Sequence, residues 1–167
     1  MSDRGKRIFL ALSIAIPFLL YSVYYYGMVL KNAPFRSKDF QSVTLKYGLG
    51  DSLVNQYNSS TGEFRYLNKR DSLVTIHVRL NKDDMLYLHH KAAELGFWDF
   101  PEHLSGTSKD PKTPHYYLEY KYREKTKRVY FDLDYNQNPK LHDAAKQLIN
   151  EVNKVINDAA DRQDAYR

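Results

Sequence analysis

An uncharged run of 23 residues near the N-terminus, IFLALSIAIPFLLYSVYYYGMVL (8–30), sets the first limit on how this chain folds. A helix needs about 20 predominantly apolar residues to cross the ~30 Å hydrocarbon core of a bilayer, so the run is long enough to span one. Tyrosines gather at its C-terminal end, where a membrane–water interface suits both ring and hydroxyl. Mid-segment Pro17 is tolerated better in a transmembrane helix than in a soluble one. We therefore predict a membrane anchor whose residues include Ile8, Leu10, Leu12, Ile14, Ile16, Phe18, Leu19, Leu20, Tyr24, Tyr25 and Tyr26.

Two other interpretations of this run are weaker. A cleaved signal peptide would have a shorter apolar core of roughly 7–15 residues and a small-x-small cleavage site, whereas Ala33 here is followed by Pro34. A buried core helix would have to be covered on all sides, which the remainder of so short a chain cannot do. The absence of cysteine excludes a lipidated N-terminal Cys and fits a domain without disulfides.

The charges on either side of the run give only a weak indication of its orientation. Three basic residues flank each end, Arg4, Lys6 and Arg7 before it and Lys31, Arg36 and Lys38 after it. Because the positive-inside rule counts such residues, the two flanks nearly balance. The α-amino group and the short N-terminal tail favour a cytoplasmic N-terminus. This predicts a single-pass signal-anchor in an inner or plasma membrane, with the C-terminal body outside the cytoplasm.

The chain divides by composition into five segments. A cytoplasmic basic tail (1–7) precedes the transmembrane helix (8–30), a polar linker (31–39) leads to the folded body (40–158), and a polar tail (159–167) ends the chain. The net charge is +5, and part of it lies in the basic tail, so the body is nearly neutral. Since nucleic-acid binding normally requires a concentrated basic face, we predict no nucleic-acid partner.

Alternating apolar and polar residues predict an antiparallel sheet in the body. Period-two alternation marks strands near 43–47, 63–66, 74–80, 116–123 and 128–133, with a weaker one near 53–58. The turn signals SSTG (59–62) and NKRD (68–71) separate three of them. Each strand has one apolar and one polar side, which is typical of a sheet with one face in the core and the other in water.

Two helices are predicted from their end signals. Asn81 and Asp84 form a variant of the capping box, and Gly96 is the expected C′ residue of the first helix. Asn138 and Pro139 begin the second helix. Each helix carries one apolar stripe. The simplest arrangement is a two-layer α+β domain, an antiparallel meander of five to six strands with both helices on one face, in the order β-β-β-(β)-α-β-β-α.

Residues Gly50-Asp51-Ser52-Leu53 resemble the block that carries the nucleophilic serine of the Gly-Asp-Ser-Leu esterases and lipases. That family also has a Gly-x-Asn-Asp block, which is missing here. None of the six histidines has an aspartate three residues before it, so Ser52 lacks the base that would activate it. The tetrapeptide DSLV occurs at 51–54 and again at 71–74, where it leads from a turn into a strand. We therefore predict a turn at both places and no esterase.

A metal site is the other catalytic option that the histidines raise. His90 and Glu94 lie one helical turn apart, a spacing common in zinc sites. Adjacent histidines on a lysine-bearing helix are more often solvated, however, and Asp132 on its strand is expected to pair with Arg128 or Lys121. We predict no metal site, no cofactor and no catalytic residue.

Tyrosine is the unusual residue in the composition, with 15 in the chain. Tyr117 and Tyr130 fall on the polar face of the predicted hairpin, where exposed aromatic rings often mark a binding site. His103 and His115 lie in the long proline-rich loop 101–115, a length that usually indicates function or mobility. We predict a ligand site at these four residues. The alternative for the two tyrosines is a cross-strand pair that only shields the sheet.

The layout of the chain resembles that of small, uncharacterised bacterial envelope proteins. These combine an anchor or lipoprotein signal, a β-meander, a helix ending in a stretch like LGFWDFP (95–101), a hairpin and a last helix. The resemblance implies an envelope location and no known activity. We therefore expect a non-enzymatic binding or scaffolding module with an envelope protein or a glycan as ligand. The rival class is a hydrolase or a metal-dependent envelope enzyme, and the oligomeric state is left open.

Overall fold

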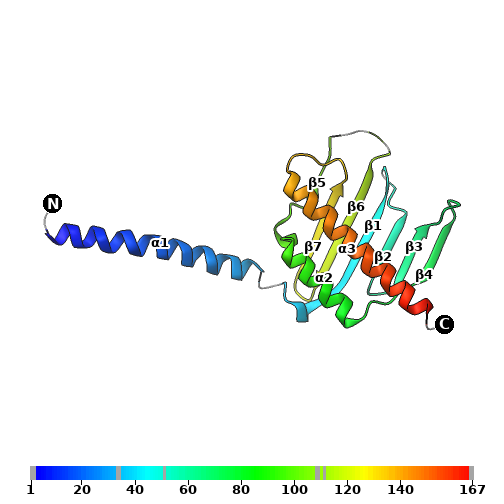
Figure 1. The fold of residues 1–167 in the computed structure, drawn as a ribbon, viewed down its shortest axis with the longest axis horizontal. Helices are drawn as coiled ribbons and strands as arrows, with labels where there is room; N and C mark the ends of the chain where they lie inside the picture. The colour runs from blue at the N-terminus through cyan, green and yellow to red at the C-terminus, as the bar shows by residue number, and fades with distance from the viewer. Residues whose placement is uncertain (1–2, 33–34, 51, 108–109, 111, 166–167) are drawn as a thin grey trace. The chain divides into compact units, whose positions relative to one another are not determined.

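The computed structural model describes residues 3–32, 35–50, 52–107, 110 and 112–165, and Figure 1 shows their arrangement. The chain separates into two units, 1–34 and 35–167. Three residues used in the sequence analysis, Ala33, Pro34 and Asp51, lie outside the described part.

The first unit is one long helix, α1 (Asp3–Asn32), with Pro17 inside it. Its stretch from Asp3 to Val29 is long and apolar enough to cross a membrane, and none of that stretch is buried against the protein. Tyr21 and Tyr25, one turn apart, stack with ring centroids 6.3 Å apart. All the predicted anchor side chains are exposed on this helix, as a lipid-facing surface requires: Ile8, Leu10, Leu12, Ile14, Ile16, Phe18, Leu19, Leu20, Tyr24, Tyr25 and Tyr26.

The second unit is an α+β domain built on a seven-stranded sheet. The strands are β1 (Phe40–Leu49), β2 (Asn55–Asn58), β3 (Glu63–Leu67), β4 (Leu73–His77), β5 (His103–Leu104), β6 (Pro114–Tyr122) and β7 (Thr126–Asp132). Their order across the sheet is β4-β3-β2-β1-β6-β7-β5. The body is wider than its predicted limits 40–158, because Phe35 is buried at one end and Ala159 at the other.

The predicted strand count and pairing differ from this sheet in two respects. The sheet is mixed rather than a five- to six-stranded antiparallel meander, because β5 pairs in parallel with β7. In addition, β1 pairs with β6 in the middle of the sheet, although the two strands are far apart along the chain. Because β5 has only two residues, it cannot show alternation of apolar and polar residues and was not predicted. The β1–β6 pairing depends on tertiary packing, which local periodicity does not contain.

Two helices, α2 (Lys82–Glu94) and α3 (Pro139–Asp164), cover the same face of the sheet, the face turned toward the viewer in Figure 1. The predicted caps are present: Asn81 and Asp84 form a reciprocal capping box. Gly96 follows α2 with φ +72°, in the left-handed region that favours glycine. The Asn138 side chain accepts from the backbone N–H of Leu141.

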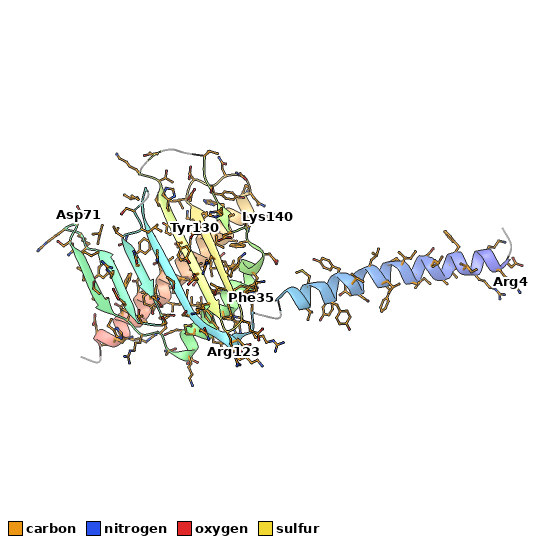
Figure 2. The ribbon with its side chains drawn as sticks, turned by 180° about the vertical axis from the view of Figure 1, so that it is seen from behind. Arg4, Phe35, Asp71, Arg123, Tyr130 and Lys140 are labelled. Atoms are coloured by element: carbon orange, nitrogen blue, oxygen red, sulfur yellow. The ribbon has the colours of Figure 1, made fainter. Side chains whose placement is uncertain are left out.

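The core lies between the sheet and these two helices. Apolar residues of alternate strand positions meet the stripe of α3, and the largest fully buried members are Val43, Leu45, Tyr57, Tyr120, Tyr122, Phe131, Leu148 and Ile156. A short 3-10 helix, η2 (Phe97–Asp99), adds Trp98, whose ring stacks on Phe35 with centroids 4.6 Å apart. Phe35, the first described residue of the body, is therefore packed into its core. The other strand positions form the opposite face of the sheet, which neither α2 nor α3 covers (Figure 2).

Candidate functional site

Three of the four predicted ligand-site residues meet on the uncovered face of the sheet. Strand register places Tyr117 of β6 opposite Tyr130 of β7, and Tyr130 opposite His103 of β5. The rings of Tyr117 and Tyr130 have centroids 5.0 Å apart, and those of Tyr130 and His103 stack at 4.8 Å with an interplanar angle of 8°. We call Tyr117, Tyr130 and His103 the aromatic row.

The aromatic row is open to solvent. Tyr130 is 40% exposed, His103 is exposed and Tyr117 is half-buried. Figure 2 shows Tyr130 on the side of the sheet opposite the helices. Tyr117 is partly buried by neighbouring side chains on this face, since neither α2 nor α3 covers it. The two tyrosines do form a cross-strand pair, and the pair also presents a surface.

Charged groups fix the Tyr117 end of the row. The Tyr117 hydroxyl donates to Glu119 Oε2 at 2.7 Å, and Arg128 Nε donates to the same oxygen at 2.8 Å. On the other side, Lys46 Nζ lies 5.6 Å from the centre of the Tyr117 ring. Partial burial, followed by the hydrogen bond to the Glu119 carboxylate, raises the pKa of Tyr117 above its ordinary value of 10.0. Tyr117 therefore stays a neutral hydrogen-bonding ring at physiological pH.

A shallow depression of about 280 Å³ continues the same face beyond Lys46. Polar side chains of β1, β2 and β3 line most of it, namely Thr44, Lys46, Gln56, Asn58, Glu63 and Arg65. Gln56, Lys46, Tyr117, Tyr130 and His103 follow one another directly across the strands. The row and the depression therefore form one continuous strip across the sheet, which we call the open-face strip.

The fourth predicted residue, His115, lies in a neighbouring row and has a different partner. His115 Nδ1 is 2.5 Å from Asp132 Oδ1, its cross-strand neighbour. The other carboxylate oxygen of Asp132 accepts from the backbone N–H of Gly106 at 2.9 Å. The expectation that Asp132 pairs with Arg128 or Lys121 is thus wrong, because His115 stands directly opposite it and Arg128 stands opposite Glu119.

The described residues of the Gly-Asp-Ser-Leu block, Gly50, Ser52 and Leu53, have the geometry of a turn on either side of Asp51. Gly50 has φ +57°, and the backbone N–H of Ser52 donates to the Leu49 carbonyl at 3.3 Å. The Ser52 carbonyl lies so close to Gly48 that a Cβ at position 48 would be 1.7 Å from it. Although Gly48 is the cross-strand neighbour of His115, no hydrogen bond joins Ser52 to a histidine among the described residues. In the part of the chain that the structure describes, the His115–Asp132 pair thus resembles a general base to which Ser52 is not hydrogen-bonded.

Two residues of α2 with metal-ligating side chains, His89 and Glu94, are bonded to other side chains. Within the described ranges, no group of three or more metal-ligating side chains lies close enough to hold an ion. Glu94 accepts from Lys91 Nζ at 2.8 Å. His89 is buried, with Nδ1 2.8 Å from the Tyr122 hydroxyl, and burial together with His90 lowers the pKa of His89 below 6.5.

Some of these residues escaped the sequence analysis. Lys46, Glu119 and Arg128 surround the aromatic row, but only the pairing of β1 with β6 brings Lys46 there. The burial of His89 could have been found, because it lies four residues after Met85 and three before Ala92, on the apolar stripe of α2.

No protein-family model, curated protein or solved structure matches this chain.

Proposed function

We propose that this chain is a single-pass membrane protein of the cell envelope whose body is a non-enzymatic binding module. In this proposal α1 crosses an inner or plasma membrane with its N-terminus in the cytoplasm, and the body lies outside. The observation that supports the binding role is the aromatic row, a set of adjoining rings on an uncovered sheet face with charged groups at one end.

The ligand that fits this strip best is an extended, polar chain, and a glycan fits better than a protein. The centre of a stable protein interface is apolar and depleted in charged residues. Here Lys46, Glu119 and Arg128 lie beside the rings, and Gln56 and Arg65 line the adjoining depression. The solvent-exposed parts of these rings offer apolar contact to a sugar, while the polar groups offer hydrogen bonds to its hydroxyls.

Co-sedimentation with insoluble cell-wall glycan tests this function. The full chain in mild detergent is mixed with purified peptidoglycan sacculi, and the bound fraction is measured across glycan concentrations. We expect the Tyr117→Ala/Tyr130→Ala double variant to bind at least tenfold more weakly, since a buried aromatic contact at a binding site commonly contributes about 2 kcal/mol. Tyr87→Ala removes an exposed tyrosine from α2, on the other side of the sheet, and serves as the matched control.

Two outcomes would contradict the proposal in different ways. If the wild-type chain stays in the supernatant at every glycan concentration, the glycan is not the ligand. If the wild type, the double variant and Tyr87→Ala all bind the glycan to the same extent, the aromatic row is not the binding surface. The fluorescence of Trp98, the single tryptophan, checks that each variant keeps its core.

A further inference from the structure

Six exposed basic residues gather at the corner of the body where the chain enters it. They come from three segments that are distant in sequence, and they are Arg36, Lys38, Lys82, Lys121, Arg123 and Lys125. We call this set the basic corner. The same segments carry three acidic residues, Asp39, Asp83 and Glu124, so the corner is net positive.

Backbone pairing explains why these segments meet. Phe40 at the start of β1 pairs with Tyr122 at the end of β6, and the N–H of Arg123 donates to the Asp39 carbonyl at 2.9 Å. The β6–β7 turn therefore lies beside the short 3-10 helix η1 (Ser37–Asp39). Lys125 Nζ lies 5.1 Å from the centre of the Phe35 ring.

The third segment joins through a shared hollow. Lys38 and Lys82 both line an open hollow of about 520 Å³, whose floor includes Phe40 and Met85. Lys82 is in the first turn of α2. The nearby Asp84 is already engaged, since Arg162 Nη2 lies 2.5 Å from its Oδ2.

Five of the six charges of this corner are not used in ion pairs of the described body. In the part of the chain that the structure describes, no ion pair is recorded for Lys38, Lys82, Lys121, Arg123 or Lys125. The loops at the opposite end of the sheet are balanced in charge instead: with the first two turns of α3, their described residues include four basic and four acidic ones. These are Lys69, Arg70, Lys112 and Lys140 against Asp71, Asp110, Asp134 and Asp143. Figure 2 shows Arg123 and Phe35 at one end of the sheet and Asp71 and Lys140 at the other.

The chain itself limits how far this corner can lie from the end of the anchor. Only five Cα–Cα steps separate Leu30, the last residue of the uncharged run, from Phe35. An extended chain advances by at most about 3.6 Å per residue, so the two residues lie within about 18 Å of each other whatever the angle between the units. Since Phe35 is buried in the body next to Lys125, the basic corner is tethered close to any bilayer that holds α1.

We propose that the basic corner docks on anionic phospholipid headgroups of the bilayer that α1 crosses. Clusters of about four to eight Lys/Arg beside a membrane-spanning helix are attracted to anionic lipid when the leaflet that faces them contains it, and the attraction fades within about one Debye length, ~8 Å at physiological salt. The short tether supplies a high effective concentration, so weak contacts suffice. Docking directs the turn 68–72 away from the bilayer. This inference rests on the transmembrane part of the proposed function.

The experiment measures the distance of the corner from headgroups in the full-length chain. Because the chain has no cysteine, a fluorophore can be attached to one introduced cysteine. On Ser37→Cys its fluorescence reports on the basic corner, and on Ser72→Cys it reports on the far end of the sheet. Each is reconstituted into nanodiscs of neutral phosphatidylcholine, with or without phosphatidylglycerol as about one lipid in three, containing a headgroup spin label as quencher. We expect several-fold stronger quenching at position 37 in the anionic discs, lost at 0.5 M salt, and no such difference at position 72.

Charge-reversed turns provide matched variants. We expect Arg123→Glu/Lys125→Glu, in the β6–β7 turn, to abolish the lipid-dependent quenching at position 37. Lys69→Glu/Arg70→Glu, in the β3–β4 turn, should leave it unchanged. Equal quenching at position 37 in neutral and anionic discs, with the chain still incorporated, overturns the docking proposal alone. A chain that fails to enter discs of either composition overturns the anchor as well. If a charge-reversed variant misfolds, the dependence of quenching at position 37 on salt and on anionic lipid, measured in the chain with its native charges, still tests the proposal.

Discussion

Two buried tyrosines allow the contribution of a single hydroxyl to be worked out from its acceptor. Tyr57 is 1% exposed and donates to the Val78 carbonyl at 3.1 Å. Tyr120 is fully buried and donates to the Leu88 carbonyl at 3.4 Å. Substitution by phenylalanine removes the same atom in both places, so the two variants differ mainly in what happens to the acceptor.

The two carbonyl acceptors differ in whether another donor remains once the hydroxyl is removed. Val78 is 1% exposed, in the connection between β4 and α2, and the Tyr57 hydroxyl is the one donor recorded for its carbonyl among the described residues. Leaving such a carbonyl unsatisfied costs about 1–3 kcal/mol, so we expect Tyr57→Phe to lower the free energy of unfolding by about 2 kcal/mol. Leu88 lies inside α2, and its carbonyl keeps the intrahelical N–H of Ala92. Tyr120→Phe loses only a long, supplementary bond, and we expect a cost below about 0.5 kcal/mol.

Urea unfolding of the full chain in mild detergent measures both values. Trp98 is the only tryptophan and is 9% exposed, stacked on Phe35, so its emission reports loss of the core. The slope of the free energy against urea must match the wild type for the comparison to hold. A Tyr120→Phe variant that is destabilised as much as Tyr57→Phe would refute the reasoning from acceptor satisfaction.

Two further predictions concern α2. Asn81→Ala removes half of the capping box and should cost about 1 kcal/mol in the same urea assay; an unchanged midpoint would contradict the cap's role. Because the folded-state pKa of His89 lies below 6.5, the unfolded chain binds the proton more readily, and stability should fall as the pH drops below about 6.5. The urea midpoints measured from pH 7.5 to 5 should fall less steeply in His89→Gln than in the wild type. Equal slopes of midpoint against pH in the two proteins would exclude His89 as the source of the pH dependence.

Local signals in the sequence were sufficient for much of this fold. The caps Asn81, Gly96 and Asn138 depend on a few neighbouring residues, and each is found as predicted. Alternation also placed Tyr117 and Tyr130 on the polar face, because the side chains of a strand point to its two faces in turn.

Features that depend on distant parts of the chain were not predictable in the same way. The proximity of Tyr130 to His103 requires β5 to lie beside β7, and two residues leave no pattern from which to infer that pairing. The partner of Asp132 is decided by register, since a shift of one residue would replace His115 by a neighbour on the other face. The basic corner likewise exists only once the first and sixth strands have paired.

The pairing of β1 with β6 also determines the order of events during synthesis. The middle of the sheet joins residues 40–49 to residues 114–122, and α3, which covers it, comes near the end of the chain. Contacts between such distant segments form slowly, because a long loop must close first. In a nascent polypeptide, α1 and the first four strands are therefore complete before the segments that close the body, β6 and α3, have been translated.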